Sequence, residues 1–215
     1  MGDEKKPLEQ RSYMCEVRAE ATDKGNKISG RPIVYESKTD LGWFDEVIER
    51  GALDGADLTD VRFLVNHDTR KIPLARSRRN NGNSTMQLSP DYEGMAIEAL
   101  LDTENNSESR SLYSAVQRGD ITGMSFMFSI DDYEWENLES DHPTRHIKKI
   151  GSVVEVSAVT FPAYDATEIN ARSKEELESA RLALEKAREQ REQSVETDSK
   201  ELELEKAKFI FRSKI

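Results

Sequence analysis

Up to about residue 160, apolar and polar positions alternate in short runs separated by turn residues. Because successive side chains of a strand point to opposite faces, this alternation predicts half-buried β-strands. The clearest runs are 13–19, 27–35, 61–65, 73–78, 85–88, 94–101, 121–130 and 147–161. Strands at such short spacing favour an antiparallel barrel or sandwich over units in which strands alternate with helices.

Glycine, proline and asparagine mark the breaks between these runs. Gly30 and Pro32 predict a bulge or an edge within the run 27–35. The pair Asn81-Gly82 predicts that residues 73–78 and 85–88 form a hairpin, since Asn-Gly is the strongest short hairpin signal. The charged stretch 133–146 is interpreted as a mobile loop.

Two segments follow a helical pattern instead. Residues 108–118 have apolar positions at helical spacing and are followed by Gly119, which predicts a helix that ends there. Residues 173–208 begin with a capping box, and their Leu and Ala positions repeat at seven-residue spacing among many charges. This thin stripe predicts a solvated helix or a weak coiled coil, with an interruption at 197–199.

The division that follows has three parts. Residues 1–11 are expected to be a disordered leader, residues 12–171 a β-domain, and residues 172–215 a charged helical tail that is exposed and separable from the domain. Without the tail, about 170 residues of ordinary apolar content remain, which is enough for a hydrophobic core.

Composition excludes several classes of function. The net charge of −11 argues against a nucleic-acid binder, which needs a basic surface for phosphates. No run approaches 18 apolar residues, so no membrane span is predicted, and the N-terminus lacks an apolar signal core. The single cysteine, Cys15, excludes an internal disulfide and is interpreted as a small buried residue.

Three short motifs carry a chemically capable group among apolar neighbours. His67 follows the apolar run 61–65, Ser125 lies in Gly-Met-Ser-Phe-Met-Phe, and Glu155 lies in Val-Val-Glu-Val-Ser. A serine, a histidine and a carboxylate are the three parts of a nucleophilic hydrolase. A carboxylate inside an apolar strand is costly unless it is paired, and a histidine that becomes cationic would supply the pairing.

Each motif also has a structural interpretation. Ser125 can fill a tight corner of a barrel, His67 can pack at a strand end, and Glu155 can face outward. Asp68 and Asp131 are further carboxylate candidates. Metal binding is weakly supported, since Pro143 separates His142 and His146, and no phosphate or dinucleotide motif is present, so neither a metal nor a cofactor is expected.

In this order, the motifs resemble the prohead maturation proteases of tailed bacteriophages over about residues 12–170. The segment 42–48 with Gly-Ala-Leu at 51–53 is similar to the family's segment before the barrel, where Leu53 replaces the usual Phe. Residues 66–68 resemble its histidine motif, 119–126 its serine motif, and 155–164 its last barrel strand.

The resemblance implies a small antiparallel β-barrel with flanking helices, similar to the herpesvirus assemblin fold. It implies that Ser125 is the nucleophile and His67 the general base. The herpesvirus enzymes use a second histidine as third member, and this chain offers none in a comparable strand, so Glu155 is placed there. If Glu155 is not the third member, the alternatives are Asp68, His142 and His146.

The resemblance further implies a serine endopeptidase that cleaves the scaffolding segment of the capsid protein and itself inside the procapsid, in the host cytoplasm. Its partners would be the major capsid protein, the procapsid and further copies of itself, with no nucleic acid or membrane. Two other classes stay open. One is a non-catalytic assembly or scaffold protein on the same barrel, and the other is a different Ser-His hydrolase.

Overall fold

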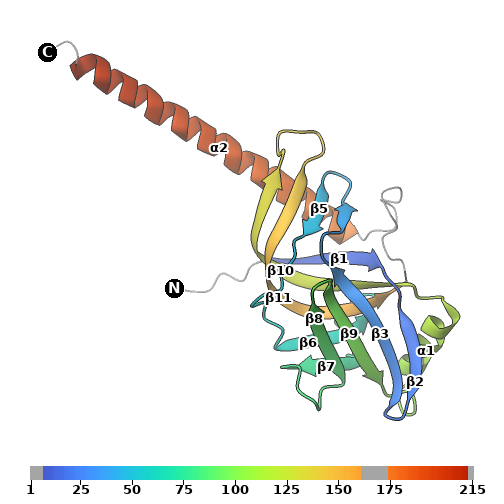
Figure 1. Cartoon of the computed structure of the whole chain (residues 1–215). Helices are drawn as coiled ribbons and strands as arrows, with labels where there is room; N and C mark the ends of the chain where they lie inside the picture. Colours follow the sequence, from blue (N-terminus) through green and yellow to red (C-terminus); the bar gives the residue numbers. More distant parts are fainter. Residues whose placement is uncertain (1–6, 161–173, 213–215) are drawn as a thin grey trace.

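Strands form most of the structure and are arranged in two sheets (Figure 1). The computed structural model describes residues 7–160 and 174–212. The larger sheet holds β1 (Leu8–Met14), β4 (Lys38–Asp40), β5 (Asp45–Ile48), β6 (Asp60–Val65), β7 (Ala75–Arg78), β10 (Gly123–Glu136) and β11 (Thr144–Val159). The smaller sheet holds β2 (Arg18–Thr22), β3 (Gly25–Val34), β8 (Met86–Asp91) and β9 (Gly94–Leu101).

The hydrophobic core joins the two sheets. Ile33 and Ile97 of the smaller sheet belong to the same buried cluster as Phe63, Phe126 and Val156 of the larger one. The apolar positions that alternate in the sequence are therefore the ones that face the core between the two sheets, as predicted. The mainly β class, with two helices, is confirmed.

The larger sheet differs from the antiparallel expectation. The order β1-β10-β11-β5-β4 is its main path, and β6 joins β11 to β7. Strand β11 pairs in parallel with β5 and with β6, because long connections rather than hairpins lead to it from those strands. Among the described residues, the recorded pairings form two open sheets, so closure into a barrel remains an expectation.

The predicted hairpin at Asn81-Gly82 is wrong. Strand β7 pairs with β6 and strand β8 pairs with β9, so the turn connects two different sheets. Between β7 and the segment before β8, side-chain hydroxyls replace the backbone carbonyls of a strand pair. The Arg76 N–H donates to Thr85 Oγ1 and the Arg78 N–H donates to Ser84 Oγ, both at 2.9 Å. In contrast, the bulge predicted near Gly30 is confirmed by a register shift between Gly30 and Ile33.

The stretch 133–146, interpreted from its charges as a mobile loop, is largely strand. It forms the far end of the β10–β11 hairpin, where Tyr133 pairs with Ile147 and Trp135 with Arg145. Its β11 side lies beside β5, where Arg145 pairs with Glu46, and the turn between β10 and β11 is at the tip of the hairpin (Figure 1). Its apolar residues Trp135 and Leu138 pack against a second, smaller hydrophobic cluster.

Helix α1 (Ser107–Arg118) matches the prediction. Asn106 accepts hydrogen bonds from the N–H groups of Glu108 and Ser109, and Gly119 ends the helix in the left-handed conformation, with a φ of 78°.

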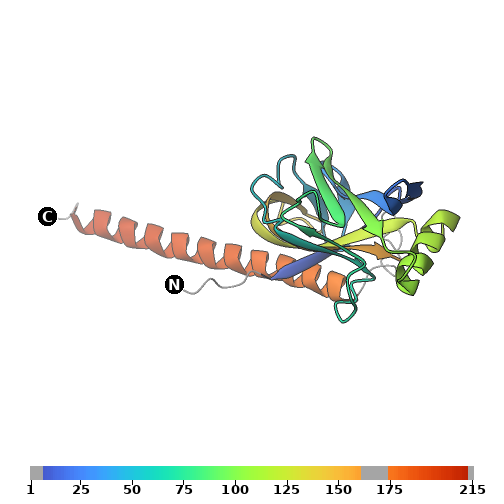
Figure 2. The ribbon, with the colours of Figure 1, turned by 90° about the horizontal axis from the view of Figure 1, so that it is seen from below.

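Helix α2 (Lys174–Arg212) runs without interruption through 197–199, so the predicted break is absent. Its first part is packed rather than exposed, since Ala180 and Leu184 are buried against Leu41 and Phe44. The later part projects away from both sheets (Figure 2). No helix in the described ranges is both long and apolar enough to cross a bilayer.

The N-terminal strand was also missed. Residues up to 11 were expected to be disordered, but β1 begins at Leu8 and pairs with β10 through Met14. Its polar residues gave no apolar alternation to recognise, because Glu9 and Arg11 are themselves buried.

Two truncations separate the packed part of α2 from the projecting part. A chain that ends at Arg172 exposes Leu41 and Phe44, and we expect it to lose about 2–3 kcal/mol of folding free energy, or roughly 5–10 °C in melting temperature. A chain that ends at Gln193 keeps these contacts and should melt like the full chain. Thermal unfolding followed by circular dichroism measures both, and equal melting temperatures for the two truncations would show that the packing contributes nothing.

Candidate active site

His67 lies in a tight turn just after β6 ends at Val65. Asn66 and His67 both adopt the left-handed conformation, with φ of 49° and 56°. Such backbone is uncommon outside glycine, although Asn and His tolerate it better than most residues. The Asn66 amide holds the turn in place, since its Nδ2 donates to Thr160 Oγ1 and its Oδ1 accepts from Thr160 N, both at 2.9 Å. Strained backbone of this kind is concentrated at functional sites.

The turn brings the His67 ring against Glu155 in the middle of β11. His67 Nδ1 makes a short hydrogen bond to Glu155 Oε1, and Glu155 is only 2% exposed. The register places Glu155 opposite Arg62 of the neighbouring parallel strand β6, five residues before His67. The buried Glu155 carboxylate therefore lies beside the His67 imidazole, which can carry a positive charge. This agrees with the expectation that a carboxylate in an apolar strand is paired.

Ser157 is a third member of this arrangement that the sequence analysis missed. Its Oγ donates to Glu155 Oε2 at 2.6 Å and accepts from the backbone N–H of His67 at 3.1 Å. The available signal was the two-residue spacing in Glu-Val-Ser, since residues two apart on a strand share one face. A small hydroxyl residue on the same face as a buried carboxylate is well placed to donate a hydrogen bond to it.

Ser125 lies directly opposite Ser157 in the β10–β11 register. Directly opposed side chains have Cβ atoms roughly 4.5–5.5 Å apart, so Ser125 stands next to the His67–Glu155–Ser157 group. Ser125 is fully buried. Its Oγ donates to the carbonyl of Arg11 at 2.7 Å and accepts from Ser12 Oγ at 2.9 Å, so both of these hydrogen bonds join it to the neighbouring strand β1.

In the described residues, the Ser125 hydroxyl and the His67 ring are not hydrogen-bonded to each other. His67 Nε2 is buried and has no hydrogen-bond partner within the described parts of the chain. Because the two ring nitrogens face different directions, Nε2 points away from Glu155 and is available for another group. The structure therefore joins His67 to Glu155 and places Ser125 near them, with its hydroxyl turned to β1.

The other groups considered for the third position have partners elsewhere. They are Asp68, which is bonded to Arg70 Nε at 2.9 Å, His142, which is bonded to Asp45 at 3.1 Å, and His146, which is bonded to Glu136 at 3.2 Å. Asp131, the other carboxylate candidate, has Lys149 Nζ at 3.9 Å. Glu155 is thus the carboxylate that contacts His67.

Cys15 is half-buried, and burial raises the pKa of its thiol. A reactive cysteine needs the opposite change, because the thiolate is the nucleophile. The interpretation of Cys15 as a packing residue therefore agrees with its surroundings.

One group of side chains has a composition that suits a metal ion. Ligand atoms of Asp40, Asp45 and His142 all lie within 4.8 Å of one another. However, Lys38 Nζ lies 2.8 Å from Asp45 Oδ2 and already supplies a positive charge there. The group lies at the end of the sheet that carries β4 and β5 and shares no residue with the Ser125 group.

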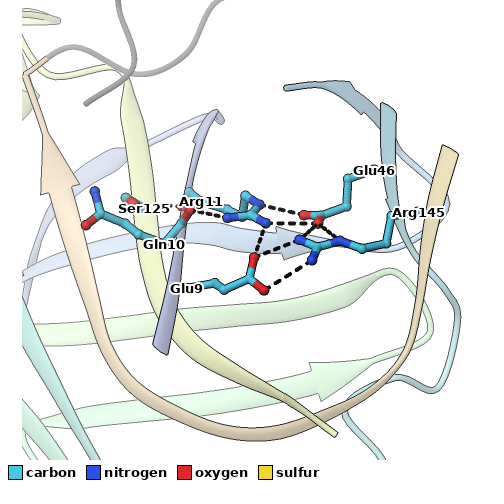
Figure 3. Close-up of polar contacts among 6 residues, drawn as sticks. All are labelled: Glu9, Gln10, Arg11, Glu46, Ser125 and Arg145. Atoms are coloured by element: carbon cyan, nitrogen blue, oxygen red, sulfur yellow. Dashed lines mark hydrogen bonds and ion pairs between the residues drawn. The ribbon is translucent and has the colours of Figure 1, made fainter. Parts of the chain in front are cut away.

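A buried cluster of four charges holds β1 against the sheet (Figure 3). Arg11 from β1 donates through Nε to Glu46 of β5 at 2.6 Å, and Arg145 of β11 donates through Nη2 to Glu9 of β1 at 2.7 Å. Arg145 also contacts Glu46 through Nε at 2.8 Å. The two positive and two negative groups balance, and they position the strand whose Arg11 carbonyl binds Ser125.

Burial alone would raise the pKa of the Glu46 carboxyl, but Arg11 and Arg145 outweigh it and lower that pKa to about 2. The pKa of Glu9 is lowered by the same two guanidinium groups, again against the effect of burial. Because both pKa values lie below the ordinary value of 4.5, the ionised cluster stabilises the fold fully above that pH. This stabilisation is lost as the pH falls from about 4.5 towards 2.

Glu46→Gln leaves two buried guanidinium groups short of one negative charge. We expect it to lower the free energy of unfolding at pH 7 by about 3–5 kcal/mol, the usual cost of breaking a buried ion pair. Urea unfolding at pH 7 and at pH 3 measures the effect, and the variant should depend less on pH than the wild type. Glu16→Gln, which removes an exposed partner of Arg18, is the control and should unfold at the same urea concentration as the wild type. Equal stabilities of Glu46→Gln and wild type would show that the cluster is not formed.

The sequence also matches a known protein family. A family model described as caudovirus prohead serine protease matches residues 14–181, which include His67, Ser125, Glu155 and Ser157. No curated protein and no solved structure gave a significant match. The matched span covers most of the chain and contains both sheets except for β1, of which only Met14 is included. The chain therefore belongs to the caudovirus prohead serine protease family.

Proposed function

We propose that this serine peptidase cleaves the scaffolding segment of the major capsid protein and its own chain during prohead maturation. Ser125 is the nucleophile, His67 the general base and Glu155 the group that orients His67. The observation that carries this assignment is the hydrogen bond between His67 Nδ1 and Glu155. The other ring nitrogen of His67, Nε2, is buried and has no partner among the described residues, and Ser125 lies opposite Ser157, which contacts both His67 and Glu155.

The chemistry follows from these groups. His67 Nε2 accepts the hydroxyl proton of Ser125 while the Ser125 oxygen attacks the scissile carbonyl carbon. The imidazolium formed is stabilised by the Glu155 carboxylate at Nδ1, and it then donates its proton to the leaving amine. A water molecule, activated by the same nitrogen, hydrolyses the acyl-enzyme and regenerates Ser125.

The structure corresponds to a closed form of this site. For catalysis, the Ser125 hydroxyl must exchange its bond to the Arg11 carbonyl for one to His67 Nε2, and a peptide must reach a side chain that is fully buried. Strand β1 is the edge strand of its sheet on that side, so its displacement opens the site without breaking the pairing of β10 with β11.

Helix α2 is the proposed contact with the scaffold. Its projecting part is rich in both acidic and basic residues and has few apolar ones, so it lacks a core of its own. Pairing with scaffold helices would hold the enzyme in the procapsid, within the host cytoplasm, and would expose the projecting part to cleavage. Self-association through this helix is part of the same proposal.

A non-catalytic assembly protein is the second candidate. The observation in its favour is the buried Ser125, both of whose hydrogen bonds are used within the fold. Against it, assembly requires neither a buried His–Glu pair nor an unpartnered ring nitrogen. A different Ser-His hydrolase would use the same residues on another substrate.

Intact mass spectrometry separates these possibilities. The purified chain is incubated alone and with the capsid protein of its own phage, with the scaffolding segment attached. Cleavage of the scaffolding segment and loss of part of α2 are expected. If neither chain is cut, the assembly role is favoured. If small ester substrates are hydrolysed while both proteins stay intact, the chain is a different hydrolase.

A further inference from the structure

Ser157 interacts with both catalytic partners of the proposed nucleophile. It contacts the carboxylate of Glu155 through its hydroxyl proton and the backbone of His67 through its lone pair. It is fully buried, and Leu64 and Ser125 are its neighbours on the two adjoining strands. Both contacts are direct hydrogen bonds, at 2.6 Å to Glu155 and at 3.1 Å from the His67 N–H.

These two contacts act on different aspects of the same geometry. The bond to Oε2 fixes the rotation of the carboxylate, so that Oε1 faces His67 Nδ1. The bond from the His67 N–H fixes the left-handed backbone at φ 56°, a conformation that a non-glycine residue leaves easily unless its surroundings retain it. One hydroxyl therefore sets both partners of the His67–Glu155 hydrogen bond.

We propose that Ser157 is a positioning residue for catalysis, which fixes the orientation of Glu155 and the backbone of His67 and does not itself contact the substrate. This inference rests on the proposed function. The alternative role of Ser157 as the nucleophile does not fit the structure, because its proton is directed to Glu155 and its hydroxyl meets the His67 backbone rather than the ring.

Ser157→Ala tests this role. Removal of the hydroxyl frees the carboxylate to rotate and leaves the His67 N–H without its partner. Hydrogen bonds to charged groups of this kind correspond to roughly 10- to 150-fold in rate, so we expect kcat to fall about 10- to 100-fold. KM should change little, because the substrate is not contacted. The substrate is a peptide that spans the junction found by intact mass.

A matched control lies on the same two strands. Ser129 and Ser152 form a hydroxyl pair across β10 and β11 at 2.9 Å, away from His67 and Glu155. Ser129→Ala removes a similarly buried hydroxyl and should leave kcat within about twofold. Ser157→Thr retains the hydroxyl and should recover most of the activity that Ser157→Ala loses. If Ser129→Ala and Ser157→Ala lose the same activity, or Ser157→Thr restores none, Ser157 has only a structural role.

A double-substitution cycle shows whether Ser157 acts through Glu155. If it does, Ser157→Ala should lower activity much less in a Glu155→Gln background than in the wild type. Independent, multiplying losses would overturn the proposal.

The rate at which a fluorophosphonate labels Ser125 gives a readout that needs no peptide. We expect the label on Ser125 in the wild type, and slower labelling in Ser157→Ala. Absence of label on Ser125 in the wild type would overturn the proposed function and this role with it. Equal labelling rates in the two proteins would overturn the role of Ser157 alone.

Discussion

Ser125→Ala, His67→Ala and the double variant are expected to lower kcat/KM for the junction peptide by the same amount, about 10⁴- to 10⁶-fold. In the proposed mechanism the two residues perform one step, since His67 serves only to move the proton of Ser125. Once either is absent, the other has nothing left to contribute. Intact mass over long incubations extends the measurable range, because a single cut in the chain or in the capsid protein is then detected.

Both variants have controls in the chain. Ser129→Ala substitutes a serine of the same strand, and His146→Ala substitutes a histidine whose ring contacts Glu136 and Glu49 instead. Each should retain activity within a few fold. Ser125→Ala and the two controls should melt near the wild-type temperature. His67→Ala leaves the buried Glu155 carboxylate without its partner and should melt at a lower temperature, so its activity is measured well below that transition. Losses that multiply in the double variant would show that His67 acts structurally and not as the base.

The residues of the candidate site were recognisable because each is a polar exception within an apolar strand or directly after one. His67, Ser125 and Glu155 interrupt periodic patterns that otherwise predict a core, and their order matched one family. Ser157 was overlooked because a serine in an apolar strand is common and requires no compensation. Its importance follows from the side chain two residues earlier, so only the pairing of both on one face reveals it.

The fold was predictable where local pattern decided it. The end of α1 at Gly119 depends on a left-handed backbone conformation that few residues other than glycine adopt. The bulge near Gly30 lies where a Cβ atom would come within 2.8 Å of the Met124 side chain, which favours glycine for a different reason. The pairing of β7 and β8 was not predictable in this way. Asn81-Gly82 specifies a turn, but which strands then pair depends on contacts of β7 with β6 and of β8 with β9.

Charged residues misled the sequence analysis in three places. Glu9 and Arg11 suggested a disordered leader, the stretch 133–146 suggested a loop, and α2 suggested an exposed helix. In each case a partner distant in sequence changes the outcome. Glu46 and Arg145 neutralise the charges of β1, strand β5 pairs with residues 144–147 of the β10–β11 hairpin, and Leu41 with Phe44 covers one stripe of α2.

Locking β1 to β10 is expected to abolish cleavage reversibly. Gln10 and Met127 are paired residues of these antiparallel strands, two positions from Ser12 and Ser125. Opposed residues in such a ladder have Cα atoms about 4.5–5.5 Å apart, which suits a disulfide. The double variant Gln10→Cys with Met127→Cys, in a Cys15→Ala background, therefore closes the strand over Ser125 under oxidising conditions and releases it when a reductant is added.

The reduced form of the same protein serves as its own reference for any effect of the substitutions. We expect at least a 100-fold lower rate of junction-peptide cleavage when the disulfide is formed, because the Ser125 hydroxyl then stays with the Arg11 carbonyl and has no access to a scissile bond. A second disulfide, Glu20→Cys with Lys27→Cys, joins the paired strands β2 and β3 of the other sheet and should not alter activity in either state. If the oxidised variant with the β1–β10 disulfide cleaves at the full rate, a substrate reaches Ser125 while β1 stays in place. The closed arrangement would then be the active one, with the rotation of a single hydroxyl as the only change needed before attack.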